Sequence, residues 1–352
     1  MTKAKTHPFP FSAKLPWSEN SANICIASIV KLQRNIAKFS FPPKLNGPGK
    51  EQIISLIEGA FEQSKAVEGY QVFRADQLKP LEKEFLFEHF FDTENIHQAY
   101  SGEAFVVDPS GTFLASINLR DHLQLQISAC ENEIEKSWNC LVEIETKLGA
   151  ILDYAFKTKF GFLTANPQNC GTALLSKVFL HLPCLIHERQ IQGLIDAENG
   201  LVASGIQGED KNFIGDIIVL ENRHTLGLSS EDIISSLHAA SMRLIVAEKT
   251  LRDKQKDSKH FKDQVSRAFG LLMNSFQIET KEALNALSMC KLGIDLQWIC
   301  NAEHSIFNEL FFFARRAHLQ STFKSSVEQE LLPEKRSEFL RHALKKLRLK
   351  IR

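Results

Sequence analysis

The chain has 352 residues, 43% of them hydrophobic and 24% charged, with 42 basic and 42 acidic side chains. This length favours a large domain followed by a smaller one, and the balanced charge gives no overall field that would draw the protein to nucleic acid or to a membrane. The N-terminal lysines precede no apolar run, and no later segment approaches the roughly 18 apolar residues of a membrane span. We expect a cytoplasmic protein.

The seven cysteines are odd in number, widely spaced and never arranged as C-x-x-C. This pattern argues against a disulfide framework and against a zinc site. We therefore expect free thiols in a reducing compartment, no metal site, and buried cysteines that act as small hydrophobic residues.

Residues 1 to about 50 form an arm rich in Pro, Ser and Asn, with one apolar segment at 24–30. The segment 49–65 predicts an amphipathic helix. Its apolar residues fall at helical spacing: Ile53, Ile54, Ile57 and Phe61. A second helix is expected at 81–93.

The segment 104–128 predicts a β-hairpin, because the turn-forming sequence Asp-Pro-Ser-Gly separates two runs rich in Val, Phe and Ile. A helix is expected at about 130–152. Three further strands follow, in the segments 174–185, 193–206 and 216–226. Because strands and helices mix without a regular βαβ alternation, the predicted fold class is α+β.

From Ser229 onward the pattern is helical and opens with a capping signal. We place a domain boundary near 255, which gives domains at 1–255 and 256–352. The last segment, 333–352, holds eight Lys or Arg against two Glu. Two interpretations stay open, a solvated helix whose charges suit its C-terminal end and a docking surface for an acidic partner.

The run KFGFLTANPQNCGTALLSKVFLHLP at 159–183 resembles the signature of the guanido (phosphagen) kinases. The segments 24–42, 117–126 and 204–215 resemble motifs of the bacterial protein arginine kinases in the same order. This resemblance implies a guanido-kinase-like catalytic domain, with an antiparallel sheet flanked by helices, followed by an all-helical C-terminal domain.

Guanido kinases move the γ-phosphoryl group of Mg-ATP to a guanidinium nitrogen, and arginines meet the phosphate charge. Four of the five matching positions have no charge and the fifth is a lysine: Ile29, Lys31, Gln124, Leu175 and Ser204. At roughly 1.5 to 3 kcal/mol for each lost charge-assisted contact, four losses cost about 6 to 12 kcal/mol. A micromolar site is worth only about 8 kcal/mol, so ATP binding should be very weak or absent.

The resemblance assigns four more positions to the nucleotide pocket. Ser28 lies beside the first lost arginine, and Ser176 and Lys177 follow the lost arginine of the signature. Lys177 is expected to point to solvent. Phe90 replaces a histidine of the family and is expected to pack in the core, with stacking on a base as the alternative.

The acceptor side of the site is altered as well. The two glutamates that orient the guanidinium in this family correspond to Leu119 and Arg120, of which the first cannot accept a proton and the second repels an incoming arginine. Asp121, His122 and the loop carboxylate Glu209 still match the family. We interpret these three as remnants rather than as catalytic groups.

The cysteine of the signature is replaced by Asn166, and Cys170 is not placed to take its role. The phosphoarginine-sensing motif of the family falls on a partly altered set: Ser337, Glu338, Arg341 and His342. Because one of its two arginines is missing, the resemblance implies only a remnant of this pocket, at Glu338 and Arg341.

The leading hypothesis is a pseudokinase, a degenerate protein arginine kinase retained as a binding or regulatory module that needs no cofactor. The alternative is an active ATP-dependent arginine phosphotransferase that uses Mg-ATP and a rearranged site with Lys31, Lys177, Arg120 and Glu209. A third hypothesis, compatible with the first, is binding of acidic partners through the C-terminal helix. The resemblance also implies a homodimer and a zinc-binding activator-like protein as partners.

Overall fold

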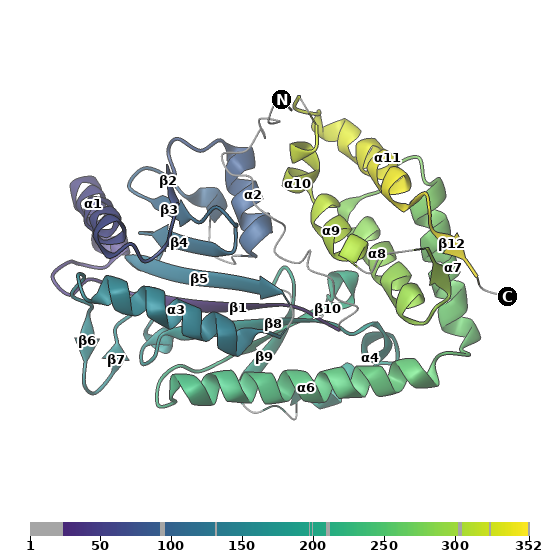
Figure 1. The fold of residues 1–352 in the computed structure, drawn as a ribbon, viewed down its shortest axis with the longest axis horizontal. Helices are drawn as coiled ribbons and strands as arrows, with labels where there is room; N and C mark the ends of the chain where they lie inside the picture. The colour runs from purple at the N-terminus through teal and green to yellow at the C-terminus, as the bar shows by residue number, and fades with distance from the viewer. Residues whose placement is uncertain are drawn as a thin grey trace.

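The computed structural model describes most of the chain (Figure 1). The described residues are 24–91, 96–130, 132–196, 198, 200–208, 212–301, 305–323 and 325–350. Glu209, the predicted loop carboxylate, lies outside them. None of the helices within these ranges combines the length and the apolar character needed to cross a membrane.

The N-terminal part is built on one eight-stranded sheet in which every neighbouring pair of strands is antiparallel. Such a sheet, flanked by helices, confirms the predicted fold class. In spatial order its strands are β2 (Gln71–Arg74), β3 (Ala104–Val107), β4 (Phe113–Ile117), β5 (Leu123–Cys130), β1 (Cys25–Arg34), β8 (Leu174–His181), β10 (Ile217–Asn222) and β9 (Leu201–Gly205).

Two long helices, α3 (Ile134–Gly149) and α6 (Ser230–Lys254), lie across one face of this sheet (Figure 1). Their apolar stripes pack on β1, β5 and β8, as helical periodicity requires. The remaining elements of this part are α1 (Gly47–Ser64), α2 (Pro80–Phe90), α4 (Pro183–His187), α5 (Ile191–Asp196) and the small hairpin of β6 (Phe156–Lys157) and β7 (Gly161–Phe162).

All three strand predictions extended too far, and the segment 216–226 leaves the sheet after Asn222. The segment 174–185 leaves the sheet after His181, because Pro183 starts α4 and the buried Glu248 carboxylate accepts the N–H groups of Cys184 and Leu185 at its N-terminus. The segment 193–206 includes the end of α5 and becomes a strand only at Leu201.

The C-terminal part is helical, with α7 (Lys259–Asn274), α8 (Thr280–Asp295), α9 (Ser305–Phe313), α10 (Arg316–Ser321) and α11 (Leu332–Leu344). These helices gather at one end of the sheet (Figure 1). A short antiparallel pair that the sequence pattern did not predict, β11 (Ile299–Cys300) with β12 (Arg348–Leu349), fastens the last residues to this part. The chain crosses between the two parts where α6 ends, at Lys254.

A first buried junction between the two parts centres on Arg252. Its guanidinium donates to Glu248 at 2.8 Å on its own helix, to Asp295 at 2.6 Å on α8, and to the carbonyl oxygen of His181 at 2.9 Å on β8. The Glu248 side chain is fully buried, and those of Arg252 and Asp295 are only 8% and 9% exposed. The elements α6, α8 and β8 therefore all contact the Arg252 guanidinium.

A second buried junction centres on Glu88 of α2. One oxygen of its carboxylate accepts the N–H of Ala317 at 3.0 Å, and the other accepts both the N–H and the Nδ1–H of His318, at 3.0 and 2.7 Å. Arg315 donates in return to the carbonyl oxygen of Glu88 at 2.9 Å. Burial raises the pKa of Glu88, while Arg315 and the two backbone N–H groups act in the opposite direction.

Candidate active site

The strand register brings the lost arginine positions to one face of the sheet. Lys31 pairs with Leu175 on β8 and with Gln126 on β5, and Ile29 pairs with Lys177. Because directly paired residues point to the same side, these side chains share a face, which we call the Lys31 face. By the same alternation, Gln124 on β5 and Ser204 on β9 also belong to the Lys31 face.

Ser28 and Ser176 lie on the opposite face, under the long helices. They alternate with Ile29 and Leu175 along their strands, and both are fully buried. The Ser176 hydroxyl donates to the carbonyl oxygen of Ile29 at 3.2 Å. These two serines therefore do not join the other nucleotide-pocket positions.

Neutral amide side chains form hydrogen bonds across the Lys31 face. Asn169 of the signature loop donates to Gln33 at 3.0 Å, and Gln33 in turn lies 3.5 Å from the Gln124 side-chain oxygen. Gln126 donates to the carbonyl oxygen of Phe90 at 2.7 Å. The three glutamines are at most 3% exposed. Four amides thus make a packed polar layer that carries no charge.

Among the described strand residues of this face two are cations, and both are buried. Lys31 is 2% exposed. Lys177, predicted to point to solvent, is 8% exposed and its ammonium group lies 2.9 Å from the Glu221 carboxylate. That prediction is wrong because β10 places Glu221 directly beside Lys177. An ammonium already neutralised by a carboxylate offers little to a phosphate.

Aromatic side chains occupy the end of the Lys31 face next to the C-terminal helices. Phe90 is fully buried in the core of the α2 region, as predicted. Its neighbour Phe91 contacts Phe179 of β8, with ring centroids 5.2 Å apart, and Phe312 of α9 at 5.5 Å. The Arg315 guanidinium stacks on the Phe91 ring at 3.9 Å, and burial lowers its pKa to about 9.

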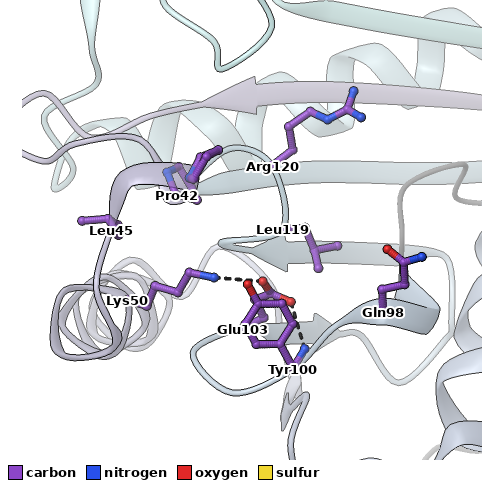
Figure 2. A pocket seen from close by; sticks show the side chains of 9 residues that line it. Pro42, Leu45, Lys50, Gln98, Tyr100, Glu103, Leu119 and Arg120 are labelled. Carbon is purple, nitrogen blue, oxygen red and sulfur yellow. Dashed lines mark hydrogen bonds and ion pairs between the residues drawn. The ribbon is translucent and has the colours of Figure 1, made fainter.

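The acceptor positions line a cavity of about 310 Å³ between α1 and the β4–β5 turn (Figure 2). Leu119 and Arg120 form one wall. Opposite them the Lys50 ammonium pairs with Glu103 at 3.0 Å, and this pair is buried. Tyr100 covers the Lys50 ammonium with its ring at 4.7 Å. Lys50, Glu103 and Arg120 thus place two cations and one carboxylate in the lining of this cavity.

Asp121 and His122 position loops. Asp121 accepts hydrogen bonds from the Asn35 amide and from the N–H of Ala165 in the signature loop, and burial raises its pKa. His122 accepts the N–H of Ile36 at Nδ1 and donates from Nε2 to Ser40, both at 3.0 Å. Burial lowers the pKa of His122 to about 4, so the ring is neutral at pH 7.

The signature loop is closed by its own side chains. Asn166 caps the short helical turn of residues 167–169 by accepting the N–H of Gln168 at 3.2 Å. The Cys170 thiol lies 3.5 Å from the Thr164 hydroxyl, beside the loop. The described residues contain no cluster of His, Cys, Asp and Glu suited to a metal ion.

The phosphoarginine-pocket positions divide between two surfaces of α11. Arg341 and Ser337 both donate to the carbonyl oxygen of Ser275, so they anchor α11 to the end of α7. Glu338 is on the solvent side and pairs with Lys335 at 2.9 Å. Glu338 and Arg341 thus have different hydrogen-bond partners in the described part of the chain.

Sequence reasoning missed the Lys50–Glu103 pair, although a signal was present. Lys50 falls on the same helical stripe as Ile53, Ile57 and Phe61, so it stands on the apolar side of α1. A lysine on a buried stripe requires a carboxylate partner. No spacing rule points to Glu103 as that partner, because it lies 53 residues away.

Comparison with known proteins identifies the family. Residues 52–251 match the model of the ATP:guanido phosphotransferase C-terminal catalytic domain, and residues 258–351 match that of the protein-arginine kinase McsB C-terminal domain. The chain is 39% identical to a protein-arginine kinase of Chlamydia pneumoniae over 90% of its length and 89% of that protein, and 30% identical to one of Clostridium tetani over 93% and 97%.

Solved structures show the same fold. Lombricine kinase superposes with a TM-score of 0.55 over 69% of this chain and 72% of that chain, at 19% identity. The duplicated taurocyamine kinase of Schistosoma mansoni superposes with a TM-score of 0.59 over 74% of this chain and 38% of that chain, also at 19% identity. The family matches and the fold together show that the chain belongs to the protein-arginine kinase family of guanido phosphotransferases.

Proposed function

We propose that this family member no longer transfers phosphoryl groups and acts as a binding or regulatory module. One observation carries the proposal: the five positions where the family holds phosphate-binding arginines contain a single cation, the buried Lys31. Phosphoryl transfer is catalysed mainly by positioning and by fixed positive charge. A face lined by neutral amides gives a triphosphate neither fixed positive charge nor the contacts that would position it.

The acceptor side supports the same proposal. A guanidinium must be oriented by carboxylates and must lose a proton before it can attack. Leu119 and Arg120 provide no carboxylate, and Glu103 is already engaged by Lys50. The described groups thus oppose binding of an arginine side chain.

An active arginine kinase is the second candidate, and the names of the relatives favour it over the first. A relative that is 39% identical over 89% of its length is called protein-arginine kinase. Such an activity would use Lys31, Lys177, Arg120 and Glu209 with Mg-ATP. The 2.9 Å pair of Lys177 with Glu221 weighs against it, because binding a phosphate would require breaking that pair.

Calorimetric titration with Mg-ATP decides between the two, followed by detection of phosphoarginine on casein. The protein-arginine kinase of Geobacillus stearothermophilus serves as the positive control. We expect no heat of binding and no product at millimolar ATP. Micromolar affinity with turnover would refute the proposal and establish the active kinase.

The partners are part of the proposal as well. We propose a homodimer and an association with a zinc-binding activator-like protein, as the family resemblance implies. Light scattering at several protein concentrations measures the first, and co-purification with a candidate activator measures the second. A monomer at all concentrations would contradict the dimer.

A further inference from the structure

The cavity of Figure 2 combines cations and apolar walls in a way that does not suit the family's guanidinium substrate. We propose that it binds an oxyanion, a carboxylate or phosphoryl group carried on a short carbon chain. The proposal rests on the proposed function, because a cavity that still accepted arginine for phosphorylation would need the opposite charge. It names a class of ligand for a site that has so far been described only by the family residues that it lacks.

Positive side chains outnumber negative ones in the lining of the cavity. Lys50 and Arg120 contribute two positive charges and Glu103 one negative charge. Both Glu103 oxygens are occupied, one by the Lys50 ammonium and the other by the N–H of Tyr100, each at 3.0 Å. The carboxylate therefore has little capacity left for an incoming cation, and the lining has a net charge of about +1.

The Arg120 guanidinium is available to bind a ligand. Its side chain is exposed at the rim, and within the described part of the chain no hydrogen bond or ion pair engages its guanidinium. Such a fork offers paired N–H donors in the geometry that carboxylate and phosphate oxygens accept. Lys50, held in place by Glu103, adds positive charge at the inner end.

The size and the apolar walls of the cavity suit a ligand with a short carbon chain. A volume of about 310 Å³ exceeds what a bare phosphate ion fills. Pro42, Leu45 and Leu119 give it apolar walls that suit a short alkyl chain (Figure 2). The backbone of the β4–β5 turn is fixed as well, because the buried Asn118 side chain donates to the carbonyl oxygens of Lys50 and Gly102, both at 3.0 Å.

Chemical modification tests the proposal on the full chain without nucleotide. Phenylglyoxal reacts with accessible arginines, and mass spectrometry gives the rate at Arg120 and at Arg223, an exposed arginine away from the cavity lining. Inorganic phosphate and glutarate should each slow modification of Arg120 without slowing that of Arg223. Ethylguanidinium should not protect Arg120.

Two variants supply the matched control. Phosphorus NMR line broadening of inorganic phosphate should show affinity weakened about tenfold or more by Arg120→Gln, and less than about twofold by Arg223→Gln. Protection by phosphate alone would identify a phosphoryl ligand, and protection by glutarate alone a carboxylate. Equal protection of both arginines, protection by ethylguanidinium, or unchanged broadening with Arg120→Gln would overturn the proposal.

These outcomes are independent of the test of the proposed function. Nucleotide binding and phosphoarginine formation are not measured in the anion experiments. A chain that fails to transfer phosphoryl groups and also fails to bind anions would retain the proposed function and lose only the oxyanion site.

Discussion

Replacing Glu88 with alanine should loosen the contact between α2 and the C-terminal helices. The change leaves two buried backbone N–H groups, those of Ala317 and His318, without an acceptor, and it removes the partner of the His318 ring. Each unsatisfied buried donor costs roughly 1 to 3 kcal/mol, and breaking a buried charged contact costs about 3 to 5 kcal/mol. We expect the free energy of unfolding to fall by about 3 to 5 kcal/mol.

Glu84 provides the matched control for this change. It lies one helical turn earlier on α2 and pairs with Arg316 at 3.1 Å, but the Arg316 side chain is 47% exposed. Glu84→Ala should therefore cost at most about 1 kcal/mol. Urea denaturation followed by circular dichroism measures both variants, and limited proteolysis shows where the chain opens. Equal losses for Glu84→Ala and Glu88→Ala would refute the role given to the Glu88 carboxylate.

Three further predictions concern pH and the signature loop. Because burial lowers the pKa of His122 from 6.5 to about 4, the unfolded chain takes up this proton first, and stability should fall as pH drops from about 6.5 towards 4. His122→Gln should make that part of the melting-temperature profile less steep, while the other buried histidines keep part of the slope, and an unchanged profile would count against the role of His122. Gly171→Ala should destabilise by more than about 2 kcal/mol, since its φ is +108° and a Cβ would lie 2.4 Å from the Thr225 carbonyl oxygen. Gly193 lies on α5, and no atom outside its own helix is near the position that a Cβ would take. Gly193→Ala should therefore leave the free energy of unfolding unchanged or raise it by about 0.5 to 1 kcal/mol in the same denaturation assay. Similar losses of stability for both glycine variants would contradict this reasoning.

Local patterns were sufficient to predict part of the secondary structure, but they did not predict β5 or identify β1 as a strand. Helical periodicity predicted α1, α3 and α6, and the turn after Asp108 predicted the β3–β4 hairpin. These signals depend only on residues close together in the sequence, so they can be interpreted without knowledge of the fold. The ends of β8 and the start of β9 were missed because they depend on a distant carboxylate, Glu248, and on the sheet register.

The site was predicted less completely, for a related reason. Resemblance located Leu119, Arg120 and the lost arginine positions, yet it did not reveal what surrounds them. The burial of Lys177 depends on Glu221, which is 44 residues away and becomes a neighbour only through the antiparallel pairing of β8 and β10. The pairing of Lys50 with Glu103 likewise exists only after α1 packs beside the β4–β5 turn.

The Arg252 junction has a consequence for how the chain moves. Separating α8 from the sheet would break the contact of Arg252 with Asp295 in a poorly solvated interior, while Arg252 would keep Glu248 on its own helix. Hinge motion between the two parts is therefore costly, and opening there should require nearly global unfolding. Amide hydrogens of β8 and of α8 should consequently exchange with deuterium at closely similar slow rates, as one cooperative unit.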